Sequence, residues 1–172
     1  MKAYARSADP LGYTFLTAND HLVFGRPWID GPTSLAAVIE ESGNMKLATT
    51  VVVPVLRGPV PTAKILGAID ILSSGRLTVA VGPGSSPRDY ALIGIPFEER
   101  WKRLDESIKT MRAVWSGGEP GFDGTYYTTS FESMEPFPAQ PGGPGVWIGS
   151  WGSAAGMRRV VRLGDGWLAS GY

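Results

Sequence analysis

One histidine is the side chain in this sequence best suited to proton transfer near neutral pH. It is His21, which follows an apolar run beside Asp20, and the chain has no second histidine and no cysteine. Such an imidazole can act as a general acid or base, or donate a hydrogen bond to a bound ring. The alternative is a loop histidine that is solvated or caps backbone groups, and position alone favours neither. A metal site is not expected, because one histidine without cysteine offers too few nitrogen or sulfur ligands.

Two glycine-rich turns follow later apolar runs and could bind an anion. Residues 82–86 read GPGSS, and residues 149–153 read GSWGS directly before a predicted helix. Backbone N–H groups of glycine turns approach anions closely, and a helix N-terminus favours negative charge. Each turn also has a structural interpretation, which for the second is simply Ser153 acting as a helix N-cap. The first turn is neither a P-loop nor a dinucleotide fingerprint. The two turns together favour a phosphate-bearing cofactor.

Other catalytic arrangements have less support. No serine lies in a G-x-S-x-G elbow, and a hydrolase triad would have His21 as its only possible base. Asp20 is the one acidic residue at the end of a predicted strand. Arg57 follows the second predicted strand and could reach an anion, although a lone arginine is more often a surface residue.

Strands and helices that alternate along the chain must position these residues. Short apolar runs predict strands at 13–17, 47–53, 77–81, 146–148 and 167–169. They are continuous rather than alternating, which is typical of parallel strands buried on both faces. Helical patterns lie between them, at 32–43, 59–75, 97–115 and 153–163. This order predicts an α/β fold with a parallel sheet, in which ligands bind beyond the carboxyl ends of the strands.

The helix predicted at 97–115 has the clearest pattern. Its apolar residues are three or four positions apart and trace one face: Phe97, Trp101, Leu104, Ile108, Met111 and Trp115. Acid-first pairs such as Glu99–Arg103 and Asp105–Lys109 lie on the other face. We expect the two tryptophans to pack against the sheet rather than to bind a ligand.

Residues 117–145 form a Gly- and Pro-rich stretch that is too long for a plain connection. We expect this insertion to be a functional loop or to hold a short ribbon around Tyr126 and Tyr127.

The composition excludes several classes of protein. The 172 residues are 43% hydrophobic and 19% charged, which suits a globular domain with a buried core rather than a disordered chain. Sixteen basic and sixteen acidic residues cancel, so neither nucleic acid nor an anionic membrane is an expected partner. There is no apolar run of membrane-spanning length and no apolar signal segment at the N-terminus, so we expect a cytoplasmic protein.

Several stretches resemble the bacterial luciferase-like flavin-dependent oxidoreductases, a family that includes enzymes using coenzyme F420. The resemblance covers nearly the whole chain, and the FEER helix combined with the LGDGW ending is its most specific part. The matching stretches are NDHLVF at 19–24, KLATTVVVPVLRGPVPTAKILGAIDILSSGRLTVAVGPG at 46–84, IGIPFEERWKRLDESIKTMRAVWSG at 93–117, GTYY at 124–127, VWIGSWGS at 146–153 and RLGDGWLASGY at 162–172.

The resemblance implies a TIM-type (β/α)8 barrel. Residues 1–172 would be a luciferase-like domain that is incomplete at both ends. It would begin within the first helix of the barrel, and it would hold about strands two to six of the eight. Because five strands cannot close such a barrel, we expect a fragment of a longer reading frame. On its own, this fragment is expected to be unstable or to need a partner chain.

The resemblance also implies a cofactor at the carboxyl face of the barrel, either FMN or F420, and the GSWGS turn favours F420. His21 would be the catalytic residue and lie against the cofactor ring. Thr50 and Val51 would form the family's non-prolyl cis peptide bond, whose bulge supports the ring. The turn residues Gly82, Gly84 and Ser85 would line the cofactor's chain. Its phosphate would be held by backbone N–H groups of Gly149, Ser150, Trp151 and Gly152.

The implied activity is that of a flavin- or F420-dependent oxidoreductase or monooxygenase, in which hydride passes through the cofactor to a small organic substrate or oxygen. The expected partners are that substrate and a second copy of the chain in a homodimer. One alternative is a non-catalytic half-barrel with weak phosphate or cofactor binding. Another is a barrel enzyme that binds a phosphorylated substrate without a flavin.

Three positions depart from the family pattern. Trp151 is bulkier than the small residue expected in the phosphate turn. Residues 56–59 read LRGP rather than LRHP, which leaves His21 unaccompanied. Ser85 stands where some F420 enzymes have an acidic residue.

Overall fold

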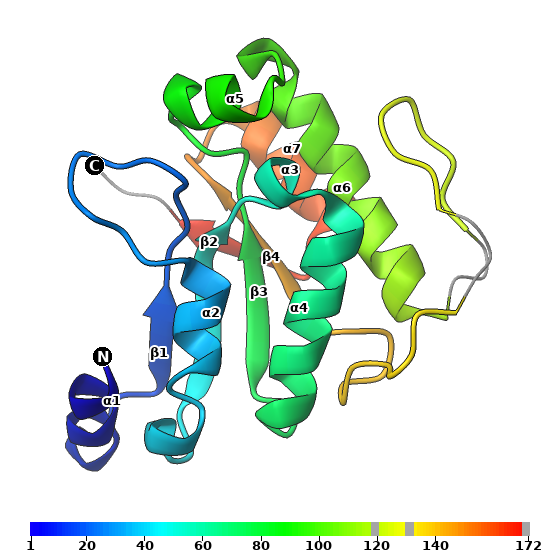
Figure 1. Cartoon of the computed structure of the whole chain (residues 1–172). Helices are drawn as coiled ribbons and strands as arrows, with labels where there is room; N and C mark the ends of the chain where they lie inside the picture. Colours follow the sequence, from blue (N-terminus) through cyan, green and yellow to red (C-terminus); the bar gives the residue numbers. More distant parts are fainter. Residues whose placement is uncertain (118–120, 130–132, 170–172) are drawn as a thin grey trace.

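A five-stranded parallel sheet forms the centre of the computed structural model, which describes residues 1–117, 121–129 and 133–169 (Figure 1). Its strands are β1 (Phe15–Ala18), β2 (Lys46–Val52), β3 (Leu77–Val81), β4 (Val146–Ser150) and β5 (Gly166–Ala169). Each of the five predicted runs overlaps one of these strands, and the predicted α/β class with a parallel sheet is confirmed.

The strands pair in chain order, β1-β2-β3-β4-β5, and every pair is parallel. Within the described residues, β1 pairs only with β2 and β5 only with β4, so these two strands are the edges of the sheet. Consecutive parallel pairing of this kind is the strand order of five successive units of a (β/α)8 barrel.

Helices connect the strands at the predicted places. The chain begins with α1 (Lys2–Ala8) and η1 (Asp9–Leu11), and α2 (Gly31–Ala36) and η2 (Glu40–Ser42) precede β2. The later helices are α3 (Pro54–Arg57), α4 (Pro59–Leu72), α5 (Pro87–Ile93), η3 (Phe97–Glu99), α6 (Arg100–Trp115) and α7 (Ala154–Leu163). The apolar pattern did not predict α3 and α5, which lie in the connections after β2 and β3.

The hydrophobic core lies between the sheet and the helices. The strands contribute Leu47, Val79, Val81, Val146 and Ile148, and the helices contribute Leu66, Ile69, Leu104, Ile108 and Met111. Leu104, Ile108 and Met111, which belong to the apolar face predicted for 97–115, are therefore part of the core. Trp115 is 3% exposed and its Nε1 donates to the carbonyl oxygen of Ala63 at 3.0 Å, which confirms that this tryptophan packs rather than binds a ligand.

Charged side chains join α6 to α7. Glu99 pairs with Arg103, as predicted, but Asp105 pairs with Arg159 and Arg162 of α7 instead of with Lys109. The prediction failed at Asp105 because α7 packs beside it in space.

Asp165, just before β5, links three elements. Its Oδ2 accepts from the backbone N–H of Val146 at 2.8 Å and from the guanidinium of Arg112 at 2.7 Å. Partial burial opposes ionisation of this carboxyl group, but these two donors outweigh burial and hold its pKa below the ordinary value of 3.8. The charged carboxylate of Asp165 therefore connects the start of β4 to α6.

The connection between α6 and β4 lies beside α6 in Figure 1. In its described parts, an isolated antiparallel bridge joins Asp123 and Thr128, around the position of the expected ribbon. The carboxylate of Glu106, on α6, accepts from three successive backbone N–H groups of the turn: Thr125 at 3.0 Å, Tyr126 at 2.7 Å and Tyr127 at 3.3 Å. Further along, Asp70 of α4 accepts from the backbone and the side chain of Gln140, at 2.9 and 2.7 Å.

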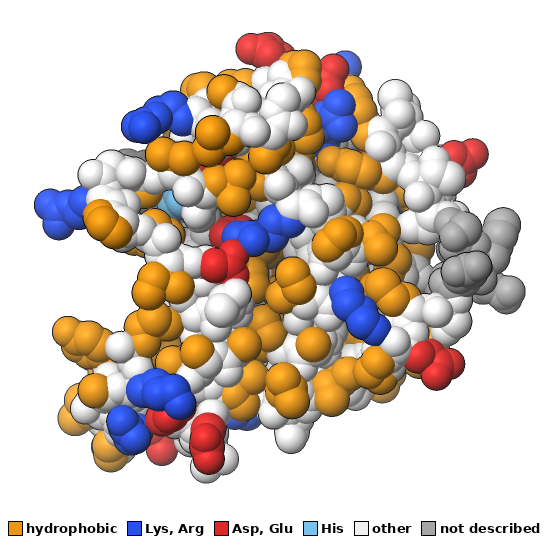
Figure 2. All heavy atoms as spheres, in the orientation of Figure 1, with side chains coloured by type: hydrophobic (Ala, Val, Ile, Leu, Met, Phe, Trp, Pro, Cys, Tyr) orange, Lys and Arg blue, Asp and Glu red, His pale blue; other side chains and the backbone are white. Residues whose placement is uncertain are grey.

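The outer surface carries hydrophobic and charged side chains side by side (Figure 2). On α4, Val60, Ile65 and Leu72 are 37%, 40% and 67% exposed. Across the described ranges, none of the helices has both the length and the apolar character needed to cross a membrane.

Candidate functional site

The predicted site residues lie at the carboxyl ends of the strands. His21 follows β1, Thr50 and Val51 belong to the end of β2, Gly82 follows β3, and Gly149 and Ser150 end β4. Because neighbouring strands are parallel, their carboxyl ends lie along the same edge of the sheet.

The end of β2 has an irregular backbone. The peptide bond between Thr50 and Val51 is cis, as the resemblance led us to expect. The pairing of β2 with β3 also shifts register between Thr50 and Val52, so that Val51 has no partner in the ladder. The backbone at Val51 therefore departs from the regular pairing geometry of β2.

The Val51 side chain lies against two glycines, Gly82 directly after β3 and Gly149 near the end of β4. A Cβ atom added at Gly82 would lie 2.7 Å from Val51 Cγ2, and one added at Gly149 would lie 2.6 Å from Val51 Cγ1. Both distances are far shorter than carbon–carbon contact allows, so each position requires glycine while Val51 stays in place. Val51, at the end of β2, thus packs against two other predicted cofactor-binding residues, Gly82 after β3 and Gly149 at the end of β4.

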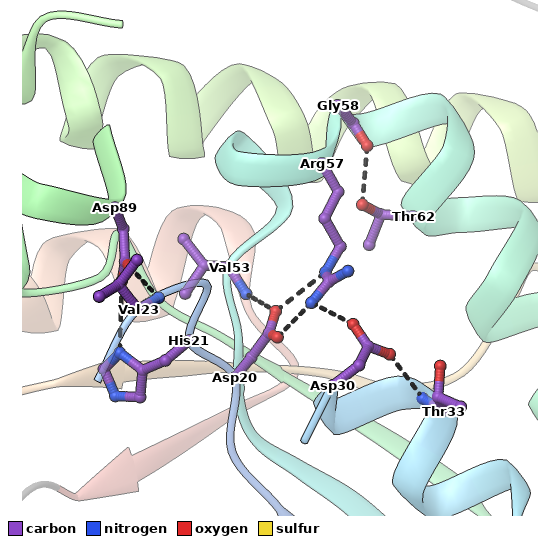
Figure 3. Close-up of polar contacts among 10 residues, drawn as sticks. All are labelled: Asp20, His21, Val23, Asp30, Thr33, Val53, Arg57, Gly58, Thr62 and Asp89. Carbon is purple, nitrogen blue, oxygen red and sulfur yellow. Dashed lines mark hydrogen bonds and ion pairs between the residues drawn. The ribbon is translucent and has the colours of Figure 1, made fainter. Parts of the chain in front are cut away.

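His21 has a carboxylate partner from a different βα unit (Figure 3). Its Nδ1 lies 3.3 Å from Oδ2 of Asp89, which is on α5, while Oδ1 of the same carboxylate accepts from the backbone N–H of Val23 at 2.7 Å. The side chains of His21 and Asp89 are 18% and 3% exposed. The expectation that His21 is unaccompanied is therefore wrong, because the turn after β3 brings α5 over the loop that follows β1.

Two aromatic rings also lie close to His21. The ring centroid of Phe24 lies 4.7 Å from that of the imidazole, and the ring of Trp28 meets it edge-on at 6.1 Å. Phe24 and Trp28 remain 48% and 41% exposed, so the three rings form an apolar surface beside the strand ends.

Arg57 is an internal cation rather than the surface residue we expected. Its guanidinium donates to both carboxylate oxygens of Asp20, through Nε at 3.1 Å and through Nη2, and Nη2 also contacts Asp30 (Figure 3). Asp20 also accepts from the backbone N–H of Val53 at 3.3 Å, and its side chain is 2% exposed. Arg57 thus fixes the loop after β1 to the end of β2.

Charges within this cluster stabilise one another. Burial disfavours the charged form of Arg57, but hydrogen bonds and charge from Asp20, and then from Asp30, raise its pKa. Partial burial likewise opposes ionisation of Asp30, whereas hydrogen bonds from Thr33 and the charge of Arg57 bring its pKa below 3.8. Both groups therefore stay charged at neutral pH, and Arg57 is engaged by protein carboxylates.

The turn after β3 folds back over β2. Gly84 has φ +72°, which favours glycine, and a Cβ atom there would lie 3.4 Å from Val53 Cγ1. Ser85 is exposed at the tip of the turn, and the hydroxyl of Tyr90 donates to the carbonyl oxygen of Pro83. Gly84 and Ser85 thus lie at the same edge of the sheet as Gly82. At position 85 the chain offers a hydroxyl group rather than a carboxylate.

The turn after β4 leads into α7. Ser153 is the N-cap, since its Oγ accepts from the N–H of Gly156 at 3.1 Å, so the capping interpretation of this serine holds. Helix geometry leaves the N–H groups of Ala154 and Ala155 without an intrahelical acceptor. Trp151 is 66% exposed and Gly152 is also exposed.

Ser150 adds a buried hydroxyl next to this helix end. It is 6% exposed, and its Oγ has no hydrogen-bond partner within the described residues. A Cβ atom at Gly156, in the first turn of α7, would lie 2.8 Å from this Oγ. A helix N-terminus with free N–H groups and an unpaired hydroxyl is chemically suited to a phosphate group.

Sequence reasoning missed the role of Asp89. Ser86 and Asp89 have the spacing of a capping box, and Ser86 does accept from the N–H of Asp89 at 3.4 Å. This signal predicts a helix from Pro87 with Asp89 in its first turn. It does not reveal that the carboxylate faces His21, a residue 68 positions earlier.

A family model described as luciferase-like monooxygenase matches residues 1–172. Among curated proteins, the F420-dependent glucose-6-phosphate dehydrogenase of Gordonia bronchialis is 32% identical over an alignment of 179 positions, which covers 96% of this chain and 51% of that protein. The chain thus spans about half the length of this curated relative.

Solved structures have the same fold. The monooxygenase RslO1 from Streptomyces bottropensis matches with a TM-score of 0.89 and 27% identity, over 96% of this chain and 51% of that one. The oxygenating constituent of 3,6-diketocamphane monooxygenase from Pseudomonas putida, solved in complex with FMN, matches with a TM-score of 0.77 and 19% identity, over 92% and 48%. The chain has the fold of about half of each of these proteins.

Proposed function

The chain belongs to the luciferase-like monooxygenase family, and from that premise we propose that it binds F420 or FMN at the carboxyl ends of its strands and serves an oxidoreductase reaction. The single observation that carries the proposal is the packing of Val51 against Gly82 and Gly149, which brings the backbones of three strand ends together beside the His21 loop. Three close-packed strand ends form a continuous floor on which a planar ring can lie.

The phosphate of the cofactor would bind at the N-terminus of α7. Ala154 and Ala155 would donate their free backbone N–H groups, and Gly149, Trp151 and Gly152 would let the turn approach the anion. The Ser150 hydroxyl, which is buried without a partner in the described chain, would gain an acceptor. The cofactor's chain would run past Gly82, Gly84 and Ser85 between these two points.

The ring of the cofactor would lie on Val51 with His21 beside it. When bound, F420 or FMN supplies the hydride chemistry, and the protein supplies position and proton transfer. His21 would hold or move a proton at its exposed nitrogen. Phe24 and Trp28 would exclude water from the ring and from a small organic substrate.

F420 is the cofactor we favour. The relative named for F420 is 32% identical to this chain, whereas the neighbour solved with FMN is 19% identical and supports the fold alone. The GSWGS turn at 149–153 also favours F420.

Ala154→Pro is the sharpest test, because it removes one proposed phosphate donor and leaves the helix intact. Ala154 is the first helical residue, where proline is well tolerated, and Ser153 has the extended backbone (φ −68°, ψ 150°) that a following proline requires. In fluorescence titrations, we expect the wild-type chain to bind F420 more tightly than FMN. Ala154→Pro should weaken F420 binding about tenfold, the value of one charge-assisted hydrogen bond.

Ala154→Gly is the matched control, since it keeps the N–H group and should retain the wild-type affinity. Failure of the wild-type chain to bind either cofactor would contradict the proposal. Equal affinities of the Ala154→Pro and Ala154→Gly variants would contradict the phosphate site.

A further inference from the structure

Asp89 uses its two carboxylate oxygens on two different donors of one loop. Oδ1 accepts from the backbone N–H of Val23 at 2.7 Å, and Oδ2 lies 3.3 Å from Nδ1 of His21. The residue is 2% exposed and sits in the first turn of α5, where Ser86 caps the helix. Its position is therefore set by a helix and not by the loop that it contacts.

A carboxylate accepts hydrogen bonds and donates none. The contact between Oδ2 and Nδ1 is therefore a hydrogen bond only when Nδ1 carries the proton. In a neutral imidazole, the other nitrogen, Nε2, then has the free lone pair. Figure 3 shows the ring of His21 with one nitrogen toward Asp89 and the other turned away from it.

We propose that Asp89 is a positioning residue that holds His21 in the Nδ1–H tautomer and so presents Nε2 as an acceptor toward the bound ligand. An acceptor at this point recognises a group that carries O–H or N–H. The role of Nε2 in accepting a hydrogen bond from the ligand rests on the proposed function, whereas the Nδ1–H tautomer itself does not.

The two contacts of Asp89 can be separated by one substitution. In Asp89→Asn, the side-chain oxygen can still accept from the N–H of Val23, so the loop keeps its attachment. The amide NH2 group then faces Nδ1 as a donor, which favours a lone pair on Nδ1 and the proton on Nε2. The expected change is a switch of tautomer rather than a loss of the loop.

The composition makes the measurement simple, because His21 is the only histidine. With 15N-labelled histidine, the two ring nitrogens give one set of NMR signals, and these report which nitrogen carries the proton. At a pH where the ring is neutral and without cofactor, we expect Nδ1 to be protonated in the wild-type chain. Asp89→Asn should shift the ratio of the tautomers toward Nε2–H by about tenfold, as expected for the loss of one charge-assisted hydrogen bond.

Two further variants complete the experiment. Asp89→Glu should keep the Nδ1–H tautomer, and Asp165→Asn, a matched change far along the sequence, should leave the ratio unaltered. A wild-type chain with the proton mainly on Nε2 would overturn the proposal even if Asp89→Asn fails to fold. An unchanged ratio in a folded Asp89→Asn chain, verified by circular dichroism, would also overturn it. Because no cofactor is present, a failure of cofactor binding leaves this result unaffected.

Discussion

Cγ1 of Val51 lies 2.6 Å from the position that a Cβ atom would take at Gly149, on a strand two places away in the sheet. The same hypothetical Cβ would lie 3.2 Å from the carbonyl oxygen of Val81, between these strands. Side chain and backbone thus close on Gly149 from two directions, and the end of β4 has no space for a larger residue.

Gly149→Ala should therefore destabilise the chain by about 1–3 kcal/mol, the usual cost of overpacking. Urea unfolding followed by circular dichroism measures the change. Val51 must move to accept the new methyl group, so affinity for F420 should fall as well.

Val51→Ala tests the mechanism of that loss. If Val51 is the obstacle, the double variant Val51→Ala/Gly149→Ala should be more stable than Gly149→Ala alone, with a coupling of about 0.5–3 kcal/mol. Strictly additive losses would show that the obstacle lies elsewhere.

Arg57→Ala should be among the most harmful single changes in this region. It would leave the carboxylate of Asp20, 2% exposed, without its cationic partner. Removing one member of a buried ion pair costs about 3–5 kcal/mol. The loss should be at the lower end, because the Arg57 side chain keeps 18% exposure. Urea unfolding measures it.

Lys102→Ala on the exposed side of α6 is the comparison for that experiment. A surface change of this kind stays within about 0.5 kcal/mol. If Arg57→Ala cost no more than Lys102→Ala, the ion-pair cluster would not hold the loop.

Asp165→Asn should change how stability depends on pH. The folded chain holds the pKa of Asp165 below 3.8, so its charge contributes stability above the unfolded pKa, and the contribution disappears as pH falls through the folded pKa. The variant should be less stable than the wild type near neutral pH, by less than about 1 kcal/mol because the pair is half exposed. The two curves should converge once the pH falls below the folded pKa of Asp165.

Thermal unfolding at a series of pH values checks this expectation. Glu98→Gln, at an exposed position, should run parallel to the wild type throughout. If the stability difference between Asp165→Asn and the wild type stayed constant down to low pH, the charge of Asp165 would not be its cause.

Glu106→Gln should loosen the turn at 125–127. The carboxylate accepts from three backbone N–H groups, and glutamine offers only one acceptor oxygen in its place. Loss of charge-assisted hydrogen bonds should raise amide exchange at Thr125, Tyr126 and Tyr127 about tenfold or more. Hydrogen exchange read by NMR measures this directly, and amides of β3 serve as the internal reference. Equal protection in both chains would exclude Glu106 as the anchor.

The sheet was predictable because its strands carry their signal locally. The apolar runs of β2 and β3 are continuous and bounded by turn residues, and β3 matches the predicted 77–81. The cis peptide bond at Thr50–Val51 could be expected only through the family resemblance. Nothing in the composition of KLATTVV indicates it.

The polar contacts of the site were not predictable, because they join residues that are distant in the chain. His21 and Asp89 are 68 positions apart, and Asp20 and Arg57 are 37 apart. Each pair depends on how a loop folds over the next βα unit, and spacing in the sequence carries no information on that. Arg57 was expected at the surface for the same reason.

The long connection after α6 has an evolutionary consequence. Residues 82–145 separate β3 from β4, against 53–76 between β2 and β3, and the connection from the end of α6 to β4 takes up residues 116–145. Doubling a loop costs only about 0.6 kcal/mol of closure entropy. The connection is attached to Glu106 of α6 through the backbone of residues 125–127, and to Asp70 of α4 through Gln140. Insertions or deletions between these anchors leave the β3–β4 pairing intact, so this segment can diversify in length while the strand ends that form the site stay unchanged.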